Sequence, residues 1–171
     1  MEQPTSIEQF QNSLTAKLKQ AAHTSFSALR VPVLSHEDAW LFDAHTVAKI
    51  VLPERIVAVP GASKHVVGIT NVGGILYTVL DFNALLNRSA VERTPRCRVI
   101  CLDLGSDTAD YIALYVDRVL DFVSADRLLT NDTIPRPFST GTLSYGNLEY
   151  QVAPAPFSHF IAAQIGNSQP S

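Results

Sequence analysis

The apolar residues of the first segment recur at helical spacing and would share one side of a helix: Ile7, Phe10, Leu14, Leu18 and Ala21. Thr5 followed by Glu8 matches a capping box ahead of this segment. The pattern predicts an amphipathic helix over residues 6–22. Its apolar stripe either docks on the rest of the chain or meets a partner, and docking is the more common of these two arrangements.

From residue 29 onward the pattern changes to short β-branched and aromatic runs, separated by turn residues about every eight to twelve positions. Such spacing is typical of a sandwich or a barrel. Pro53 cannot donate to a sheet ladder and marks the end of a strand. The runs that predict strands cover residues 30–34, 39–43, 47–52, 55–59, 66–72, 75–81, 98–104, 111–117, 119–124, 142–145 and 148–152. The chain is therefore predicted to be mainly β.

Turn residues between neighbouring runs predict hairpins. Gly73 and Gly74 join the runs over residues 66–72 and 75–81, and this dipeptide tolerates the positive φ angles of a tight turn. Residues 82–86, directly after the second run, predict a short helical turn. Three more hairpins are expected around the turns at residues 35–38, 105–107 and 146–147.

The segment from residue 128 to residue 152 combines a loop with a strand. Residues 128–140 contain two prolines and little periodicity, which predicts a long loop. Leu148, Tyr150 and Val152 alternate with Glu149 and Gln151. This alternation predicts a half-buried strand with its polar side chains outward.

A second amphipathic pattern lies near the end of the chain. Pro156 suits the first turn of a helix and Gly166 suits its end. The apolar residues between them would share one face: Phe157, Phe160, Ile161 and Ile165. Residues 167–171 are expected to fray. These patterns predict a helical extension over residues 1–26, one domain over residues 27–166 and a flexible tail over residues 167–171.

Composition and charge narrow the possible partners. A chain of 171 residues with 46% hydrophobic residues suits one compact domain. The formal net charge of −3 argues against nucleic acid, which requires a dense basic face. The one basic cluster is expected to be a solvated surface: Arg88, Arg93, Arg96 and Arg98. No apolar run approaches the length of a membrane span, and no basic segment followed by an apolar one marks a secretory signal, so we expect a cytoplasmic protein without direct membrane insertion.

The chain offers little metal or cofactor chemistry. Cys97 and Cys101 stand four residues apart on one predicted strand, which places their Cα atoms about 13 Å apart and too far for a disulfide. Two buried thiols are the simpler interpretation. The five histidines are scattered without metal-ligand spacing. We therefore expect neither a metal nor another cofactor.

No arrangement of residues indicates catalysis. Gly141, Ser144 and Gly146 miss the spacing of a nucleophile elbow by one residue and lie in a predicted hairpin. Four aspartates stand beside turns, where a carboxylate usually accepts hydrogen bonds from turn amides: Asp81, Asp103, Asp117 and Asp121. The sequence thus predicts a binding protein and not an enzyme.

Two motifs resemble the CheW family of chemotaxis adaptors. In the stretch from residue 65 to residue 81 four positions match the family pattern: Gly68, Asn71, Gly74 and Asp81. Residues 112–119 are similar to a later strand of the family that carries a Val-Asp pair. The resemblance covers roughly residues 29–163. The leading helix and the segment over residues 137–159 look most like the PilI-type branch, which serves type IV pilus twitching motility.

The resemblance implies a pair of intertwined five-stranded SH3-like barrels with an N-terminal and a C-terminal helix. It also implies a non-catalytic scaffold that bridges the regulatory domain of a CheA-type histidine kinase to the cytoplasmic tip of a chemoreceptor. Small barrels suit this role because they present strand edges and a groove between them. The alternative is a barrel without kinase coupling that binds another protein or a small ligand.

The resemblance also assigns candidate partner-binding residues: Val47, Lys49, Val51, Asn71, Gly73 and Gly74. The family's groove strand corresponds to residues 47–51, with Val47 at the apolar contact, although core packing explains Val47 equally well. Lys49 stands where the family usually has Glu, and Gly73 where it usually has Arg. Because charge complementarity sets specificity, we expect these two departures to alter partner recognition.

Overall fold

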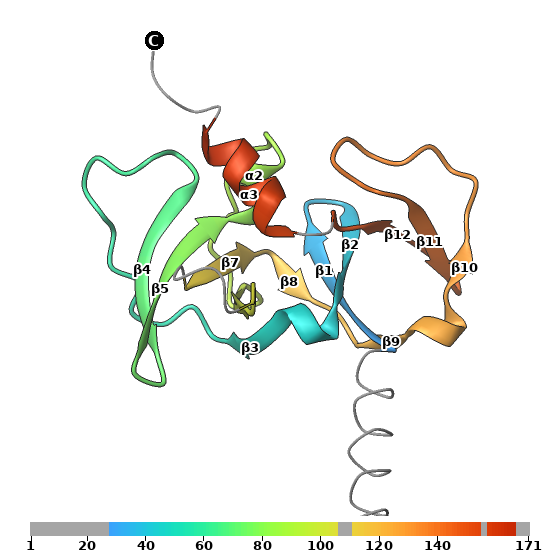
Figure 1. Ribbon diagram of the computed structural model, residues 1–171, viewed down its shortest axis with the longest axis horizontal. Coiled ribbons are helices and arrows are strands. Elements are labelled where there is room, and N and C mark those ends of the chain that lie inside the picture. Colours follow the sequence, from blue (N-terminus) through green and yellow to red (C-terminus); the bar gives the residue numbers. More distant parts are fainter. Residues whose placement is uncertain (1–27, 106–110, 155–156, 167–171) are drawn as a thin grey trace, which may run out of the picture.

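The protein consists of two β lobes with a helix over their junction (Figure 1). The computed structural model describes residues 28–105, 111–154 and 157–166. The mainly β prediction is confirmed. The helix predicted over residues 6–22, Pro156 and the predicted tail lie outside the described residues.

The first lobe is a sheet with the strand order β10-β11-β12-β2-β1-β8, in which β9 also pairs with β1. Its strands are β1 (Leu29–Ser35), β2 (Asp38–Asp43), β8 (Arg118–Val119), β9 (Val123–Ser124), β10 (Leu129–Thr130), β11 (Thr142–Tyr145) and β12 (Leu148–Val152). The 3-10 helix η2 (Ala125–Arg127) connects β9 to β10. The predicted hairpins β1–β2 and β11–β12 are both confirmed.

The second lobe is a five-stranded sheet with the order β3-β6-β7-β5-β4. Its strands are β3 (Val47–Val51), β4 (Val66–Val72), β5 (Ile75–Asp81), β6 (Arg98–Leu102) and β7 (Ile112–Val116). The remaining helices are η1 (Ala44–Thr46), α2 (Phe82–Leu85) and α3 (Phe157–Gly166). The chain leaves the first sheet after β2, builds the whole second sheet and then returns, so the two lobes are intertwined as expected.

The second sheet curls until its two ends meet. Val57, just beyond β3, forms an antiparallel bridge to Ile69 in β4, with N···O distances of 2.9 and 2.8 Å. The strand predicted over residues 55–59 is wrong beyond this single bridge. Arg55 has a φ of 52°, which breaks the extended backbone on which a longer ladder depends.

Two predictions for residues 128–152 are wrong. The loop predicted over residues 128–140 contains the short strand β10, which pairs with β11. Gln151 is buried and Leu148 is exposed, against the predicted alternation. Gln151 accepts a hydrogen bond from the Arg136 amide at 2.8 Å, which satisfies its buried oxygen. Leu148 lies at the turn end of β12, beyond the part that pairs with β2.

Strands β5, β6 and β7 are buried on both faces. Val79, Val99 and Ala113 pack inside the second lobe. The residues that follow them, Leu80, Ile100 and Leu114, pack into a core shared by the two lobes and α3. Double-sided burial explains why these strands read as continuous apolar runs instead of alternating ones.

Aromatic side chains connect the lobes at this shared core. The Phe82 ring lies 5.8 Å from Trp40, 5.5 Å from Phe42 and 6.3 Å from Phe157, measured between ring centroids. Phe157, Phe160 and Ile161 of α3 are buried, and Ile165 packs against the same core. The predicted apolar face of the C-terminal helix is confirmed.

A polar cluster joins the lobes at the β1–β2 turn. Arg88 pairs with Asp38 and donates to the Ser35 carbonyl at 2.9 Å. Asn83 and the His36 amide both donate to Asp117, at 3.0 and 2.8 Å. The prediction that all four arginines of the basic cluster are solvated is therefore wrong for Arg88, which holds the two lobes together.

Three of the four aspartates beside turns accept backbone hydrogen bonds as predicted. Asp81 accepts from Ala84 at 3.0 Å, which caps α2, and from Val91 at 2.8 Å. Asp103 accepts from Gly105 at 3.1 Å, and Asp117 accepts from His36. Both cysteines are free and buried, as predicted.

Candidate functional site

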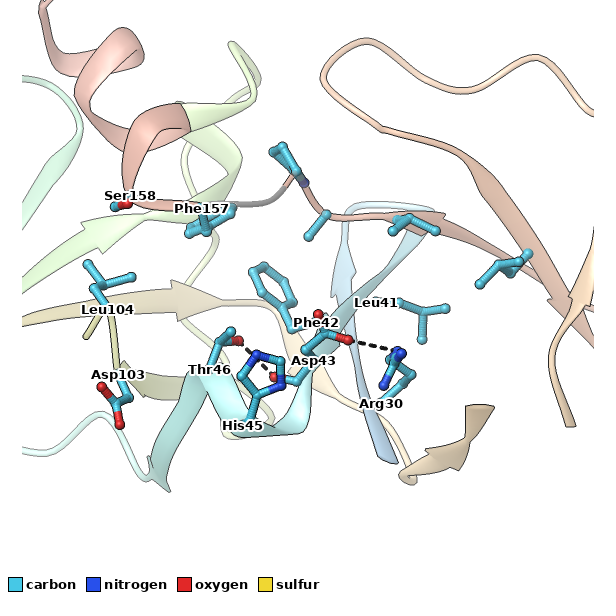
Figure 2. A pocket seen from close by; sticks show the side chains of 14 residues that line it. Arg30, Leu41, Phe42, Asp43, His45, Thr46, Asp103, Leu104, Phe157 and Ser158 are labelled. Atoms are coloured by element: carbon cyan, nitrogen blue, oxygen red, sulfur yellow. Dashed lines mark hydrogen bonds and ion pairs between the residues drawn. The ribbon is translucent and has the colours of Figure 1, made fainter. Parts of the chain in front are cut away.

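A cleft of about 440 Å³ lies between the two lobes (Figure 2). Its apolar lining comes from β2, the end of β6, β12 and the start of α3: Leu41, Phe42, Leu104, Val152, Ala153 and Phe157. Its polar lining includes Arg30, Asp43, His45, Thr46 and Asp103. An apolar floor with charged groups at the rim is a surface of the kind that the apolar side of an amphipathic helix binds.

The cleft's rim is held by short local contacts. Arg30 and Asp43 are cross-strand partners in the β1–β2 hairpin, and their side chains form an ion pair at 2.9 Å. The Thr46 hydroxyl donates to the Asp43 carbonyl at 2.7 Å, and the Thr46 backbone carbonyl accepts from the Asp103 amide at 2.9 Å. These bonds tie the rim of the first lobe to the end of β6 in the second.

A second exposed surface lies on the outer face of β4 and β5. Val57, Ile69 and Leu76 are 68%, 37% and 63% exposed. The register of the Val57–Ile69 bridge and of the β4–β5 pair places these side chains, together with Asn71, on one face. We refer to Val57, Ile69, Asn71 and Leu76 as the hairpin face. Contiguous exposed apolar residues beside a sheet edge are typical of a protein interface.

The predicted groove strand divides between two environments. A bulge shifts the register of β3 between Val47 and Lys49. Val47 is half-buried and packs against the core shared by the lobes, whereas Val51 packs inside the second lobe. Lys49 is exposed. The bulge therefore turns Lys49 away from the side on which Val47 packs.

Lys49 and the β4–β5 turn are adjacent. Gly73 and Gly74 have φ angles of 62° and 88°, and the Asn71 side chain accepts from the Gly74 amide at 2.9 Å. A Cβ at Gly73 would lie 2.9 Å from Lys49 Nζ. A side chain at position 73 would thus compete with Lys49 for the same space. The two departures from the family pattern are physically coupled.

Burial also changes the chemistry of groups beneath this surface. Burial raises the pKa of the Cys101 thiol, and the nearby Lys49 ammonium opposes part of that shift. Burial likewise raises the pKa of Tyr77. Both groups stay protonated near neutral pH, so neither of them places a negative charge beside Lys49.

Within the described ranges no cluster of three or more His, Cys, Asp or Glu residues could hold a metal ion. None of the described helices is long and apolar enough to span a membrane.

The candidate partner-binding residues from the sequence lie near one of the two surfaces. Asn71, Gly73, Gly74 and Lys49 lie on or beside the hairpin face, but none of the six candidate residues lines the cleft. The cleft brings together six separate stretches of chain, so no local motif indicates it. The Arg30–Asp43 pair is the exception that the sequence could have indicated, because a hairpin that joins residues 30–34 and 39–43 places these two residues opposite each other.

Two intertwined β lobes with an apolar cleft and an exposed apolar strand face are typical of scaffolds that bind other proteins. The sequence agrees with this class, because the model of the CheW-like domain matches residues 31–147. The chain belongs to the CheW-like family, the adaptors of chemotaxis signalling.

A solved structure supports the fold. The scaffolding protein TtCheW from Thermoanaerobacter tengcongensis is similar over 77% of this chain and 91% of its own, with a TM-score of 0.63 and 18% identity. No curated protein matches the chain. The predicted CheW-like architecture is confirmed.

Proposed function

We propose that this protein is a non-catalytic adaptor that couples a chemoreceptor to a CheA-type histidine kinase. The main support for this proposal is that one fold presents two separate apolar surfaces, the cleft and the hairpin face. An adaptor needs two such surfaces because it must hold both partners at the same time.

We assign the cytoplasmic tip of the receptor to the cleft. Receptor tips of this family are helical, and a helix binds by laying its apolar side into an apolar groove. The cleft supplies Leu104 and Phe157 as apolar contacts and Arg30 and Asp103 as charged groups at the rim. Val47 lies directly after the rim residues His45 and Thr46 and is the nearest of the predicted partner-binding residues in the chain.

We assign the kinase regulatory domain to the hairpin face. That domain resembles the adaptor's own barrels within the family, and barrels of this kind can meet through exposed strand edges. Val57 and Ile69 provide apolar area at the point where the second sheet closes. Lys49 and the β4–β5 turn border this area and would contribute to specificity.

Titration calorimetry tests both assignments. Val57→Asp is expected to weaken binding of the kinase regulatory domain at least tenfold, since a central apolar contact contributes about 1–3 kcal/mol. Leu129→Asp is the matched control, because Leu129 is 67% exposed but lies on the first lobe. Leu104→Asp is expected to weaken receptor-tip binding alone.

Absence of saturable binding by the unmodified protein to both partners would overturn the adaptor proposal. It would favour the alternative in which the cleft takes another protein or a small ligand. The cleft's volume lies within the range of small-molecule sites, so that alternative has a structural basis.

The Lys49–Gly73 contact leads to a separate expectation about specificity. Changing Lys49→Glu together with Gly73→Arg introduces the residue pair usual in the family. We expect the double variant to bind this protein's own partners about tenfold more weakly, because their surfaces complement Lys49. Lys64→Gln, at another exposed lysine, lowers the net charge by one as the double variant does and serves as the control for net charge. Tighter binding by the double variant would contradict the expectation.

We further place the adaptor in a pilus-linked chemosensory system. The resemblance of residues 137–159 to the PilI-type branch supports this placement. Phe138 packs on Phe160 of α3 with 5.6 Å between ring centroids, so the segment is part of the described fold and not an appendage. Loss of twitching, with swimming unaffected, is the phenotype expected on deletion of the gene.

A further inference from the structure

The inter-lobe cleft has an apolar floor, and the described part of the chain begins close to its rim. Arg30, which lines the cleft, is only three residues beyond the segment 1–27. Leu104, Val152 and Ala153 on the lining remain partly exposed. We propose that residues 1–27 dock their apolar stripe in this cleft in the free protein.

Among the parts of the chain outside the described residues, only the segment 1–27 has the composition to cover an apolar cleft. Residues 106–110 read Ser-Asp-Thr-Ala-Asp and residues 167–171 read Asn-Ser-Gln-Pro-Ser, so neither carries large apolar side chains. Residues 155–156 are too few to cover the cleft. The segment 1–27 alone carries a stripe that needs burial, formed by Ile7, Phe10, Leu14 and Leu18.

The length of the segment allows it to fold back on the cleft. The predicted helix over residues 6–22 would be about 25 Å long at 1.5 Å per residue. The connection from residue 22 to Arg30 spans up to roughly 26–29 Å when extended. This connection is long enough for the helix to reverse direction and lie along the cleft.

Charge also favours this occupant. Asp103 at the rim forms no ion pair among the described residues. On the predicted helix Lys17 borders the apolar stripe, three positions after Leu14 and one before Leu18. Docking of the stripe would bring the Lys17 ammonium toward the rim that carries Asp103.

The docked segment would occupy the surface that the proposed function gives to the receptor tip. This inference rests on the proposed function, and it implies that the receptor tip must displace residues 1–27 from the cleft. The docking itself can be tested on the free protein, so its failure would leave the proposed function standing.

A spin label in the N-terminal segment tests the docking. Ala16→Cys places a reactive thiol on the polar side of the predicted helix, and the native Cys97 and Cys101 are fully buried. The label is expected to broaden the amide signals of Thr46, Leu104 and Ser158 at the cleft more strongly than those of the hairpin face. Leu14→Asp should remove this broadening, whereas Asn12→Asp on the polar side should retain it.

A mixing experiment distinguishes docking within one chain from docking between two copies. It combines isotope-labelled protein that lacks the spin label with spin-labelled protein that lacks the isotope. We expect no broadening at the cleft in the mixture. Broadening in the mixture would show that a second copy supplies the segment and would overturn the proposal. Absence of cleft-specific broadening in the labelled chain itself, or broadening that persists in Leu14→Asp, would also overturn it.

Discussion

Gly68→Ala is expected to lower the free energy of unfolding by about 3 kcal/mol, because a side chain at this position has no room and no suitable backbone conformation. A Cβ on Gly68 would lie 2.3 Å from the Val57 carbonyl oxygen and 2.8 Å from an Ile56 methyl group. The φ of 156° adds strain for any L side chain. The clash falls on backbone, which cannot move aside without breaking the Val57–Ile69 bridge.

Urea unfolding of the unmodified chain and the variant measures this loss. Gly141→Ala is the matched control, since a Cβ there meets nothing within 4 Å. We expect the control to stay within about 0.5 kcal/mol of the unmodified chain. A Gly68→Ala variant with an unchanged midpoint would show that the second sheet is not closed as described.

The Val57–Ile69 bridge also lies in the surface proposed to bind the kinase. Val57 and Ile69 form both the closure of the sheet and the apolar centre of the hairpin face. Opening the bridge would separate these side chains. Any Gly68→Ala protein that remains folded is therefore expected to lose affinity for the kinase regulatory domain.

Phe82→Ala is expected to cost about 3–5 kcal/mol, the range found when a large buried aromatic side chain is removed. The Phe82 side chain is fully buried and contacts the rings of Trp40, Phe42 and Phe157. These rings come from β2 and α3, so the cavity would open between the lobes and the C-terminal helix. No neighbouring side chain is free to fill it, because each one packs in the same core.

Trp40 is the single tryptophan of the chain and reports on this junction by its fluorescence. Thermal unfolding followed at this residue should show a lowered midpoint for Phe82→Ala. Phe122→Ala is the control, since Phe122 is 51% exposed and its removal should cost less than about 1 kcal/mol. Equal midpoints for the two variants would contradict the packing described for α2. Because Phe42 and Phe157 line the cleft, the destabilised variant should also bind the receptor tip more weakly.

Local sequence patterns specify the individual strands, turns and helices. Gly73 and Gly74 predict the β4–β5 hairpin with its observed bounds. The short helical turn predicted after β5 is α2, and Asp81 accepts a turn amide there as predicted. The apolar face of α3 is likewise visible in the spacing of Phe157, Phe160 and Ile161. Such features depend on turn chemistry and periodicity within a few residues, so they can be read without knowledge of the rest of the chain.

Other features depend on contacts between segments that are far apart in the chain. The strand expected over residues 55–59 is reduced to one bridge, because Val57 finds its partner in β4 only where the sheet closes. Gln151 is buried because the Arg136 amide, fifteen residues away, satisfies its oxygen. Sequence periodicity could not indicate either outcome, since both partners lie in other segments.

The two candidate binding surfaces also differ in how far the sequence indicates them. The resemblance to the family indicates Lys49 and Gly73 as candidates. Only the curled sheet shows that they are neighbours, because Lys49 Nζ lies 2.9 Å from the position that a Cβ added at Gly73 would take. The cleft was not visible in the sequence, because its lining joins the hairpin of the first lobe, the end of β6 and the start of α3. The chain's local patterns determine which elements form, whereas the packing of the two lobes determines which side chains face one another across the cleft.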